Sequence, residues 1–224
     1  MCKLDTAPFR RTPTVTSSAP KQCDFSCMQK QVQDPASLLY VHLARDILAE
    51  TMKMYPSDSV WVTGHSLGGS LAALASLSIT HRAPHTLVPA ITFEAPGTRS
   101  MAERAGVFPA RHQVPEGMHQ DAWTGILDAA LSALPIYHFG NAGDPVFVGR
   151  CNGLASSCRF AGYSMETRCH IGRTCVYAKD RLALNIRHHA LGYLLKHFLE
   201  RTDVDVPECL LETGCTDCLD WAYV

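Results

Sequence analysis

The stretch S-V-W-V-T-G-H-S-L-G-G-S, residues 59–70, decides the fold that this sequence predicts. Residues 59–63 are mostly β-branched and aromatic, which predicts a short buried strand. Residues 66–79 are rich in Ala and Leu and predict a buried helix. Between them, G-H-S-L-G at residues 64–68 fits the pattern G-x-S-x-G. A strand that runs through this pattern into a helix is the context of a nucleophile elbow.

The chemistry of such an elbow depends on the turn between strand and helix. The serine, Ser66, would stand in a strained turn that lifts its hydroxyl above the sheet, and Gly64 and Gly68 would leave room for that turn. The helix that follows points its positive end at the reacting centre. We therefore expect Ser66 to be a nucleophile and the Leu67 N–H to be a first oxyanion donor. The alternative is a glycine-containing turn with an idle serine.

A serine nucleophile needs a base, and the base needs an orienting acid, which follow it in this chain order in α/β-hydrolases. Asp144 stands in Gly-Asp-Pro just after a predicted strand at residues 136–139. The carboxyl end of a strand is where we expect the acid. Asp128 and Asp180 are weaker candidates because neither follows a clear strand.

Candidate bases lie near the C-terminal helix predicted over residues 184–200. His188 and His189 are both at its junction with the preceding loop, and the pattern does not choose between them. His170 lies among cysteines and His197 deep in the helix, so both are weaker candidates. His65 is expected to pack beneath the elbow.

The rest of the chain alternates predicted helices and strands, which favours an α/β sheet. We expect a helix over residues 37–54, a strand over 88–93 and a possible helix over 123–134, with Trp61 and Phe93 in the core. Residues 1–22 are expected to be a flexible leader, 23–205 the main domain and 206–224 a Cys-rich tail. Within the main domain, residues 149–180 form a Cys- and Gly-rich excursion with little periodicity.

Cysteine content and charge narrow the class of protein. The chain has 224 residues, 10 of them Cys, and a net charge of −1. The cysteines cluster, as at Cys169 and Cys175, and predict short disulfide loops in an oxidising compartment. A metal site that includes Cys215 and Cys218 is the alternative. The sequence has no long basic run, which argues against a protein that binds nucleic acid mainly through charge. Residues 1–15 lack the apolar core of a secretory signal, so we expect an N-terminally incomplete sequence.

Several longer segments carry a family resemblance. They are M-Y-P-S-D-S-V-W-V-T-G-H-S-L-G-G-S-L, T-F-E-A-P-G, H-F-G-N-A-G-D-P-V-F-V-G-R-C-N-G, G-Y-S-M-E-T-R-C-H-I-G and C-T-D-C-L-D-W, in this order. The chain thus resembles the class 3 lipases, and among them the fungal autophagy-related lipases of the vacuole. The resemblance implies an α/β-hydrolase fold and hydrolysis of phospholipid and acylglycerol esters. It also implies Ser66 as nucleophile, Asp144 as acid and His189 as base.

Further expectations follow from the same resemblance. The substrate would be a lipid bilayer in the vacuole lumen or a multivesicular body, with no cofactor, metal or nucleic acid. Family members start with a membrane anchor and have an F-R-G-T-like segment that supplies the second oxyanion donor. The F-R-R-T at residues 9–12 lacks that glycine, so we expect the first strands to be missing. The alternatives are a small-ester or feruloyl-type esterase, a catalytically impaired truncated remnant and a Cys-rich metal-binding module.

Overall fold

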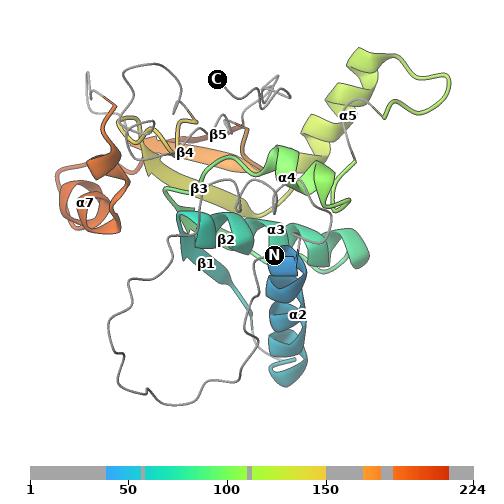
Figure 1. Cartoon of the computed structure of the whole chain (residues 1–224), viewed down its shortest axis with the longest axis horizontal. Coiled ribbons are helices and arrows are strands. Elements are labelled where there is room, and N and C mark those ends of the chain that lie inside the picture. Colours follow the sequence, from blue (N-terminus) through green and yellow to red (C-terminus); the bar gives the residue numbers. More distant parts are fainter. Residues whose placement is uncertain (1–38, 57–58, 110–112, 150–168, 178–183, 212–224) are drawn as a thin grey trace, which may run out of the picture. The chain divides into compact units, whose positions relative to one another are not determined.

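A computed structural model describes residues 39–56, 59–109, 113–149, 169–177 and 184–211, which contain one sheet (Figure 1). Its strands follow one another in chain order, and the first four are parallel. The last strand is antiparallel to the fourth. The strands are β1 (Val62–His65), β2 (Ala90–Phe93), β3 (Ile136–Asn141), β4 (Arg173–Tyr177) and β5 (Cys209–Leu211).

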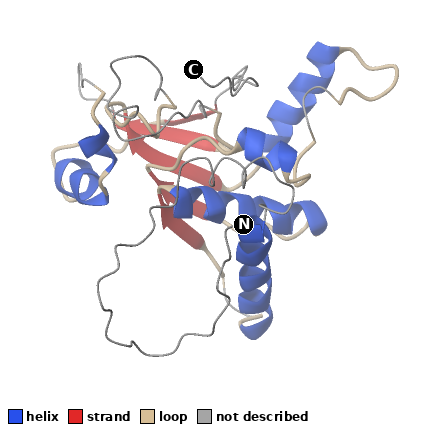
Figure 2. Ribbon diagram, viewed as in Figure 1, coloured by secondary structure: helices blue, strands red, loops and turns tan. Residues whose placement is uncertain are grey.

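Helices connect β1 to β2 and β2 to β3, because parallel neighbours need a crossover connection. Figure 2 shows these helices around the sheet. The chain runs from α2 (Leu39–Met54) into β1 and returns to β2 through α3 (Leu67–Arg82). Two further helices, α4 (Arg99–Arg104) and α5 (Gln120–Ser132), lie between β2 and β3. The α/β class expected from the alternating pattern is confirmed.

The core of this layered arrangement lies between α3 and its neighbours. The central part of α3 is buried, and Ala73 and Leu74 are completely inaccessible to solvent. Leu48 of α2, Ala75 of α3 and Val88 form one buried cluster. Such burial of apolar surface is the main force that fixes a helix against a sheet. It anchors the start of α3, and with it the turn that carries Ser66.

A second cluster holds the C-terminal helical segment near the carboxyl ends of the strands. Tyr177, Leu194 and Phe198 are buried together, and Phe93 and Phe139 pack against them. The phenylalanines are register partners on β2 and β3 with ring centroids 6.1 Å apart. This packing places the turn just before Leu194 at the edge of the sheet where β1, β2 and β3 end.

The predictions are wrong about the bounds of the first strand, the burial of Trp61 and the C-terminal helix. β1 begins at Val62 and includes Gly64 and His65, so Trp61 precedes the strand and is 60 % exposed instead of lying in the core. The helix expected over 184–200 is a 3₁₀ turn, η2 (Ile186–His189), then α7 (Leu191–Leu194) and a π turn, η3 (Leu195–Leu199). The break falls at Ala190, whose backbone is extended.

The predicted Cys-rich excursion over 149–180 contains strand β4, which periodicity does not reveal. β4 is covered on both edges, since it pairs with β3 and β5. Thr174, Cys175 and Tyr177 are buried, which breaks the simple alternation of an exposed strand. The proposed leader over residues 1–22, residues 150–168 of the excursion and residues 212–224 of the tail lie outside the described residues.

The disulfide of Cys175 closes a longer loop than the short ones that the sequence predicts. Cys175 of β4 is bonded to Cys209 of β5, 34 residues further along the chain. The two cysteines are register partners in the antiparallel ladder. Cys169, the sequence neighbour of Cys175, is disulfide-bonded as well. The pairing with Cys209 therefore depends on the sheet, which brings distant cysteines opposite each other.

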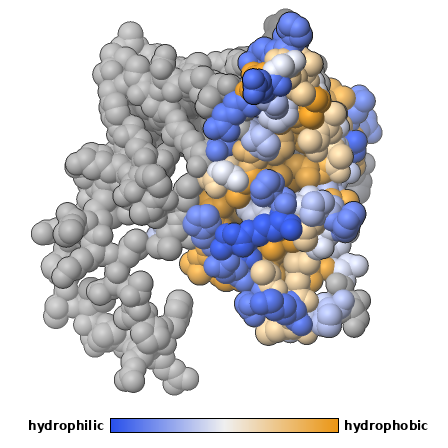
Figure 3. Space-filling view, turned by 90° about the vertical axis from the view of Figure 1, so that its right-hand side faces the viewer, coloured by the Kyte–Doolittle hydropathy of each residue, from blue (hydrophilic) through white to orange (hydrophobic). Residues whose placement is uncertain are grey.

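The described surface is not uniformly polar, and hydrophobic areas lie beside hydrophilic ones in the side view of Figure 3. Exposed apolar side chains include Leu43 and Ile47 on α2 and Ile126 on α5. Among the helices of the described residues, none has the length and hydropathy needed to span a bilayer.

Candidate active site

Ser66 occupies the turn between β1 and α3 in an unusual backbone conformation. Its φ is 56° and its ψ is −130°, a region that residues other than glycine rarely adopt. The Ser66 N–H donates to the Phe93 carbonyl at 2.9 Å, and its own carbonyl accepts from the N–H groups of Gly69 and Ser70. These bonds on both sides of the residue hold the turn, in agreement with the strand–turn–helix context of an elbow.

The turn depends on glycines at two positions. A Cβ on Gly64 would lie 2.4 Å from the backbone of Gly68, and one on Gly69 would lie 2.9 Å from Ala95 Cβ. At Gly68, by contrast, a Cβ would meet nothing within 4 Å. The expectation that Gly68 leaves room for the turn is therefore wrong. That steric role belongs to Gly64 and Gly69.

The structure brings the side chains of Ser66, His189 and Asp144 into one hydrogen-bonded chain. His189 Nε2 is 2.7 Å from Ser66 Oγ, and His189 Nδ1 is 2.8 Å from Asp144 Oδ2. A carboxylate only accepts, so Nδ1 carries the proton and Nε2 is left to accept from the serine hydroxyl. This is the tautomer that a general base for Ser66 needs.

Asp144 is completely buried yet well bonded. It follows β3, and its Oδ1 accepts from the Val146 N–H at 2.9 Å while Oδ2 faces His189. Its own N–H donates to the Asn141 carbonyl at 3.1 Å. A buried carboxylate is tolerated only where such donors replace water. The Gly-Asp-Pro turn therefore presents the carboxylate to the imidazole in one orientation.

The turn η2 carries His189 and is tied to the loop of the acid. The Asn185 N–H donates to the Gly143 carbonyl at 3.0 Å, and His188 Nδ1 donates to the same carbonyl at 3.1 Å. The ring of His188 thus contacts the residue before Asp144, while the ring of His189 reaches Ser66. The structure separates the two histidines that the sequence pattern left open.

His65, expected beneath the elbow, contacts the turn of His189 directly. Its Nε2 lies 2.8 Å from the His189 carbonyl, to which it donates. His65 is therefore better described as a support for the η2 turn than as packing alone.

The weaker candidates for the catalytic base and acid make contacts elsewhere in the fold. His170 Nε2 donates to the Ala95 carbonyl at 3.0 Å, and the His197 ring is tilted against the Tyr193 ring with the centroids 4.2 Å apart. Asp128 pairs with Arg99 at 2.9 Å. Asp180 lies outside the described residues.

Sequence reasoning missed two polar residues beside Asp144. Glu94 directly follows β2, is completely buried and has a φ of 48°. It accepts from Asn141 Nδ2 at 2.6 Å and is hydrogen-bonded to Asp144. Burial, and then the hydrogen bond and charge of Asp144, raise the pKa of Glu94 to about 10. A signal was present in T-F-E-A-P, since this acid also follows a predicted strand.

The expected oxyanion donor lies at the start of α3. Leu67 is its first residue, and the first N–H groups of a helix have no acceptor within the helix. The Leu67 side chain is 56 % exposed. The F-R-R-T segment at residues 9–12 lies outside the described residues.

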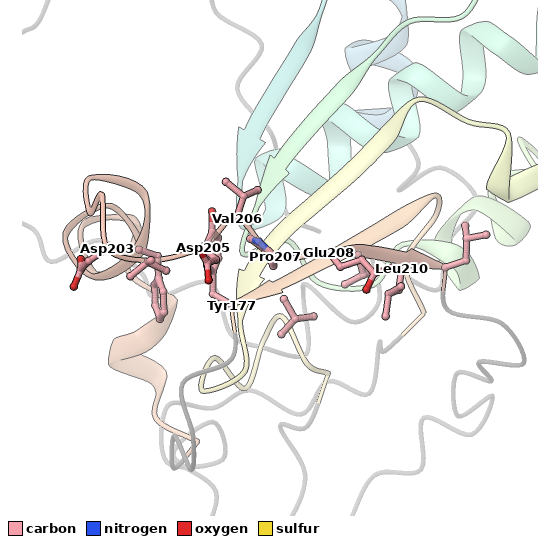
Figure 4. A pocket seen from close by; sticks show the side chains of 12 residues that line it. Tyr177, Asp203, Asp205, Val206, Pro207, Glu208 and Leu210 are labelled. Carbon is pink, nitrogen blue, oxygen red and sulfur yellow. The ribbon is translucent and has the colours of Figure 1, made fainter.

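No group of three His, Cys, Asp or Glu side chains is arranged to hold a metal ion in the part of the chain that the structure describes. Cys215 and Cys218, the alternative metal ligands, are not in that part. A pocket of about 760 Å³ lies at the β4–β5 end of the sheet (Figure 4). It is lined by acidic and apolar residues, including Asp203, Asp205 and Glu208, and not by the residues around Ser66.

Comparison with known proteins gives consistent matches. Residues 15–110 match the family "Lipase (class 3)". The chain is 34 % identical over 205 residues to "Putative lipase ATG15" of Eremothecium gossypii, 33 % over 205 to that of Saccharomyces cerevisiae and 32 % over 207 to that of Candida albicans. Each match covers 90 % of this chain but only 33 %, 34 % and 30 % of the respective relative. The chain thus spans about a third of the length of these relatives.

Proposed function

The chain belongs to the class 3 lipase family, which has the α/β-hydrolase fold, and from this premise we propose that it hydrolyses the carboxylic esters of lipids. In this proposal Ser66 is the nucleophile, His189 the general base and Asp144 its orienting acid. The observation that carries it is the unbroken hydrogen-bonded chain from Ser66 Oγ through His189 to Asp144.

The proposed reaction has two half-reactions. Ser66 Oγ attacks the ester carbonyl while His189 Nε2 takes the hydroxyl proton, and Asp144 stabilises the imidazolium that forms. The Leu67 N–H donates to the oxyanion of the tetrahedral intermediate. His189 then gives its proton to the leaving alcohol, which leaves an acyl group on Ser66. Water repeats the sequence against this acyl-enzyme and releases the fatty acid.

Phospholipids and triacylglycerols are the substrates that we propose. Two kinds of observation support this choice. The relatives are named putative lipases. In addition, the exposed apolar residues Leu67 and Leu191 stand next to Ser66 and two residues after His189 in the sequence, where an acyl chain could contact them. Together with the family resemblance, the relatives' name leads us to propose a role in the lysis of autophagic bodies in the vacuole.

The test is Ser66→Ala against the parent on a series of esters from short to long acyl chains, including phospholipid vesicles. We expect a loss of about 10³-fold or more in kcat, because only binding and the oxyanion donors would remain. Circular dichroism and the melting temperature of the variant should match those of the parent. Activity of Ser66→Ala within tenfold of the parent would reject the proposal. Turnover of short-chain esters alone would instead indicate a small-ester esterase.

A further inference from the structure

We propose that Glu94 is a positioning residue of the active site, a neutral carboxylic acid that donates a hydrogen bond to Asp144 and holds the Asp144 carboxylate toward His189. The inference rests on the proposed ester hydrolysis at Ser66. It extends the hydrogen-bonded chain by one member, which lies behind the acid and touches neither substrate nor reacting atoms.

The place of Glu94 in the fold aims its side chain at Asp144. Parallel strands end at a common edge, so the residues that follow β2 and β3 are neighbours there. The Glu94 N–H donates to the Phe139 carbonyl at 2.8 Å, which continues the β2–β3 ladder by one residue. Its φ of 48° is a conformation that side chains other than Asn and Asp rarely adopt. A strained backbone conformation persists only where the surrounding structure holds it, and strained residues are often found at functional sites.

The contact between the carboxyl groups of Glu94 and Asp144 requires one proton. A hydrogen bond joins the two side chains, and two ionised carboxylates have no hydrogen to share. Asp144 Oδ1 accepts from the Val146 N–H and Oδ2 accepts from His189 Nδ1, so both of its oxygens already have donors. The proton therefore belongs to Glu94, which has no solvent exposure. Burial is also the largest cause that raises the pKa of Glu94.

Asn141 fixes the orientation of the Glu94 carboxyl group. Its Nδ2 donates to Glu94 Oε1 at 2.6 Å and to the His188 carbonyl at 3.1 Å. Its backbone N–H lies 3.3 Å from Glu94 Oε2. One amide group thus connects Glu94 to the turn that carries His189. Among the described residues, Asp144 is the titratable group whose charge acts on Glu94. The His170 ring lies close by along the chain, since its Nε2 donates to the carbonyl of Ala95 at 3.0 Å.

The charge of Glu94 has a measurable consequence for His189. If Glu94 were ionised, it would add a second negative charge near the imidazole, and this charge would stabilise the imidazolium. Replacing Glu94 by Gln would then move the acidic limb of the pH–rate profile to lower pH. If Glu94 is a neutral donor, Gln preserves its main contacts, because the amide can donate to Asp144 while its oxygen accepts from Asn141 Nδ2. Only the longer contact of Oε2 with the Asn141 N–H, at 3.3 Å, is given up.

The experiment compares Glu94→Gln and Glu94→Leu with the parent on a soluble short-chain ester, with kcat, KM and the pH profile of kcat/KM measured for each. Glu103→Gln is the matched control, since Glu103 is a poorly exposed carboxylate that pairs with Arg99. Ser66→Ala is measured alongside. If Ser66→Ala is active, the proposed function itself is wrong. The Glu94 variants therefore test the present proposal only if Ser66→Ala is inactive.

For Glu94→Gln we expect kcat within about threefold of the parent and an unmoved acidic limb. Glu94→Leu should lose about tenfold or more in kcat with KM changed little, because Asp144 loses its donor and its orientation. An acidic limb moved down by about one pH unit or more in Glu94→Gln would overturn the proposal. So would a kcat of Glu94→Gln as low as that of Glu94→Leu, or a Glu94→Leu variant as active as the parent. If Glu94→Leu does not fold, the pH profile of Glu94→Gln still tests whether Glu94 is a neutral donor.

Discussion

The disulfide between Cys175 and Cys209 should stabilise the fold through the loop that it closes. The loop spans a sequence separation of 34 and contains η2, and therefore His189. The change that tests this is the double substitution Cys175→Ala and Cys209→Ala. Alanine is preferred to serine because Cys175 is completely buried, and a serine hydroxyl there would need a hydrogen-bond partner.

The contribution of this disulfide to the free energy of unfolding follows from the length of the loop that it closes. A cross-link that closes a loop of this size removes about 13 cal/mol/K of entropy from the unfolded chain, which is about 4 kcal/mol at 25 °C. That is a large fraction of the ordinary stability of a domain. In the folded state, the register pairs of β4 and β5 remain, since the ladder does not depend on the sulfur atoms. We therefore expect a lower unfolding free energy but little change in the geometry around His189.

Urea unfolding monitored by tryptophan fluorescence measures this stability, with the parent as reference and no reductant present. We expect the midpoint to fall by the amount that corresponds to about 4 kcal/mol, while kcat on a soluble ester below the transition stays within about threefold of the parent. A loss below about 1 kcal/mol would refute the reasoning from loop entropy. A large loss of kcat in the still-folded variant would show instead that the disulfide positions His189.

The remaining predictions concern the two histidines, the buried acid and the elbow. His189→Ala should be as inactive as Ser66→Ala, with His188→Ala clearly milder. The opposite order would contradict the proposal, which rests on the observed contacts of the two rings. The folded-state pKa of Glu94, about 10, lies above its ordinary value of 4.5, so the native protein keeps a proton that the unfolded chain releases. The stability of the parent should therefore fall with rising pH, by about 1.4 kcal/mol per unit between these values relative to Glu94→Gln, as urea midpoints at about pH 5.5 and 7.5 would show. Gly64→Ala should destabilise the protein by about 2 kcal/mol or more through its clash with Gly68, while Gly68→Ala should be tolerated, and equal midpoints for the two variants would refute the steric reading.

Much of the fold was readable from local patterns. The run of apolar residues before G-H-S-L-G and the Ala-rich run after it predicted β1 and α3, because a buried strand and a buried helix each have a composition of their own. The bounds were less well defined. Trp61 looked like core because it is large and apolar, but it precedes the ladder and has little to pack against. β4 was hidden because Thr174 and Cys175, which point to opposite faces of the strand, are both buried, so its polarity need not alternate.

The candidate site was predictable in part for a similar reason. Ser66 and Asp144 each follow a strand, and the topology of a parallel sheet brings such residues to one edge. Glu94 follows a strand as well. If the residue after every predicted strand had been considered, Glu94 would have been among the candidate site residues. That it is neutral could not be predicted, since its protonation depends on Asn141, Asp144 and complete burial, which are contacts made only in the folded chain.

The sequence by itself thus determined the elbow at Ser66, the α/β class and the short set of polar residues from which a site could be built. Only the tertiary structure decided which histidine ring reaches Ser66 and which cysteine is bonded to Cys175. Neighbouring residues in a 3₁₀ turn point about 120° apart, so long-range contacts choose between His188 and His189. The ring of His189 meets a serine 123 positions away. Such pairings depend on how strands and helices pack, and no local pattern contains that information.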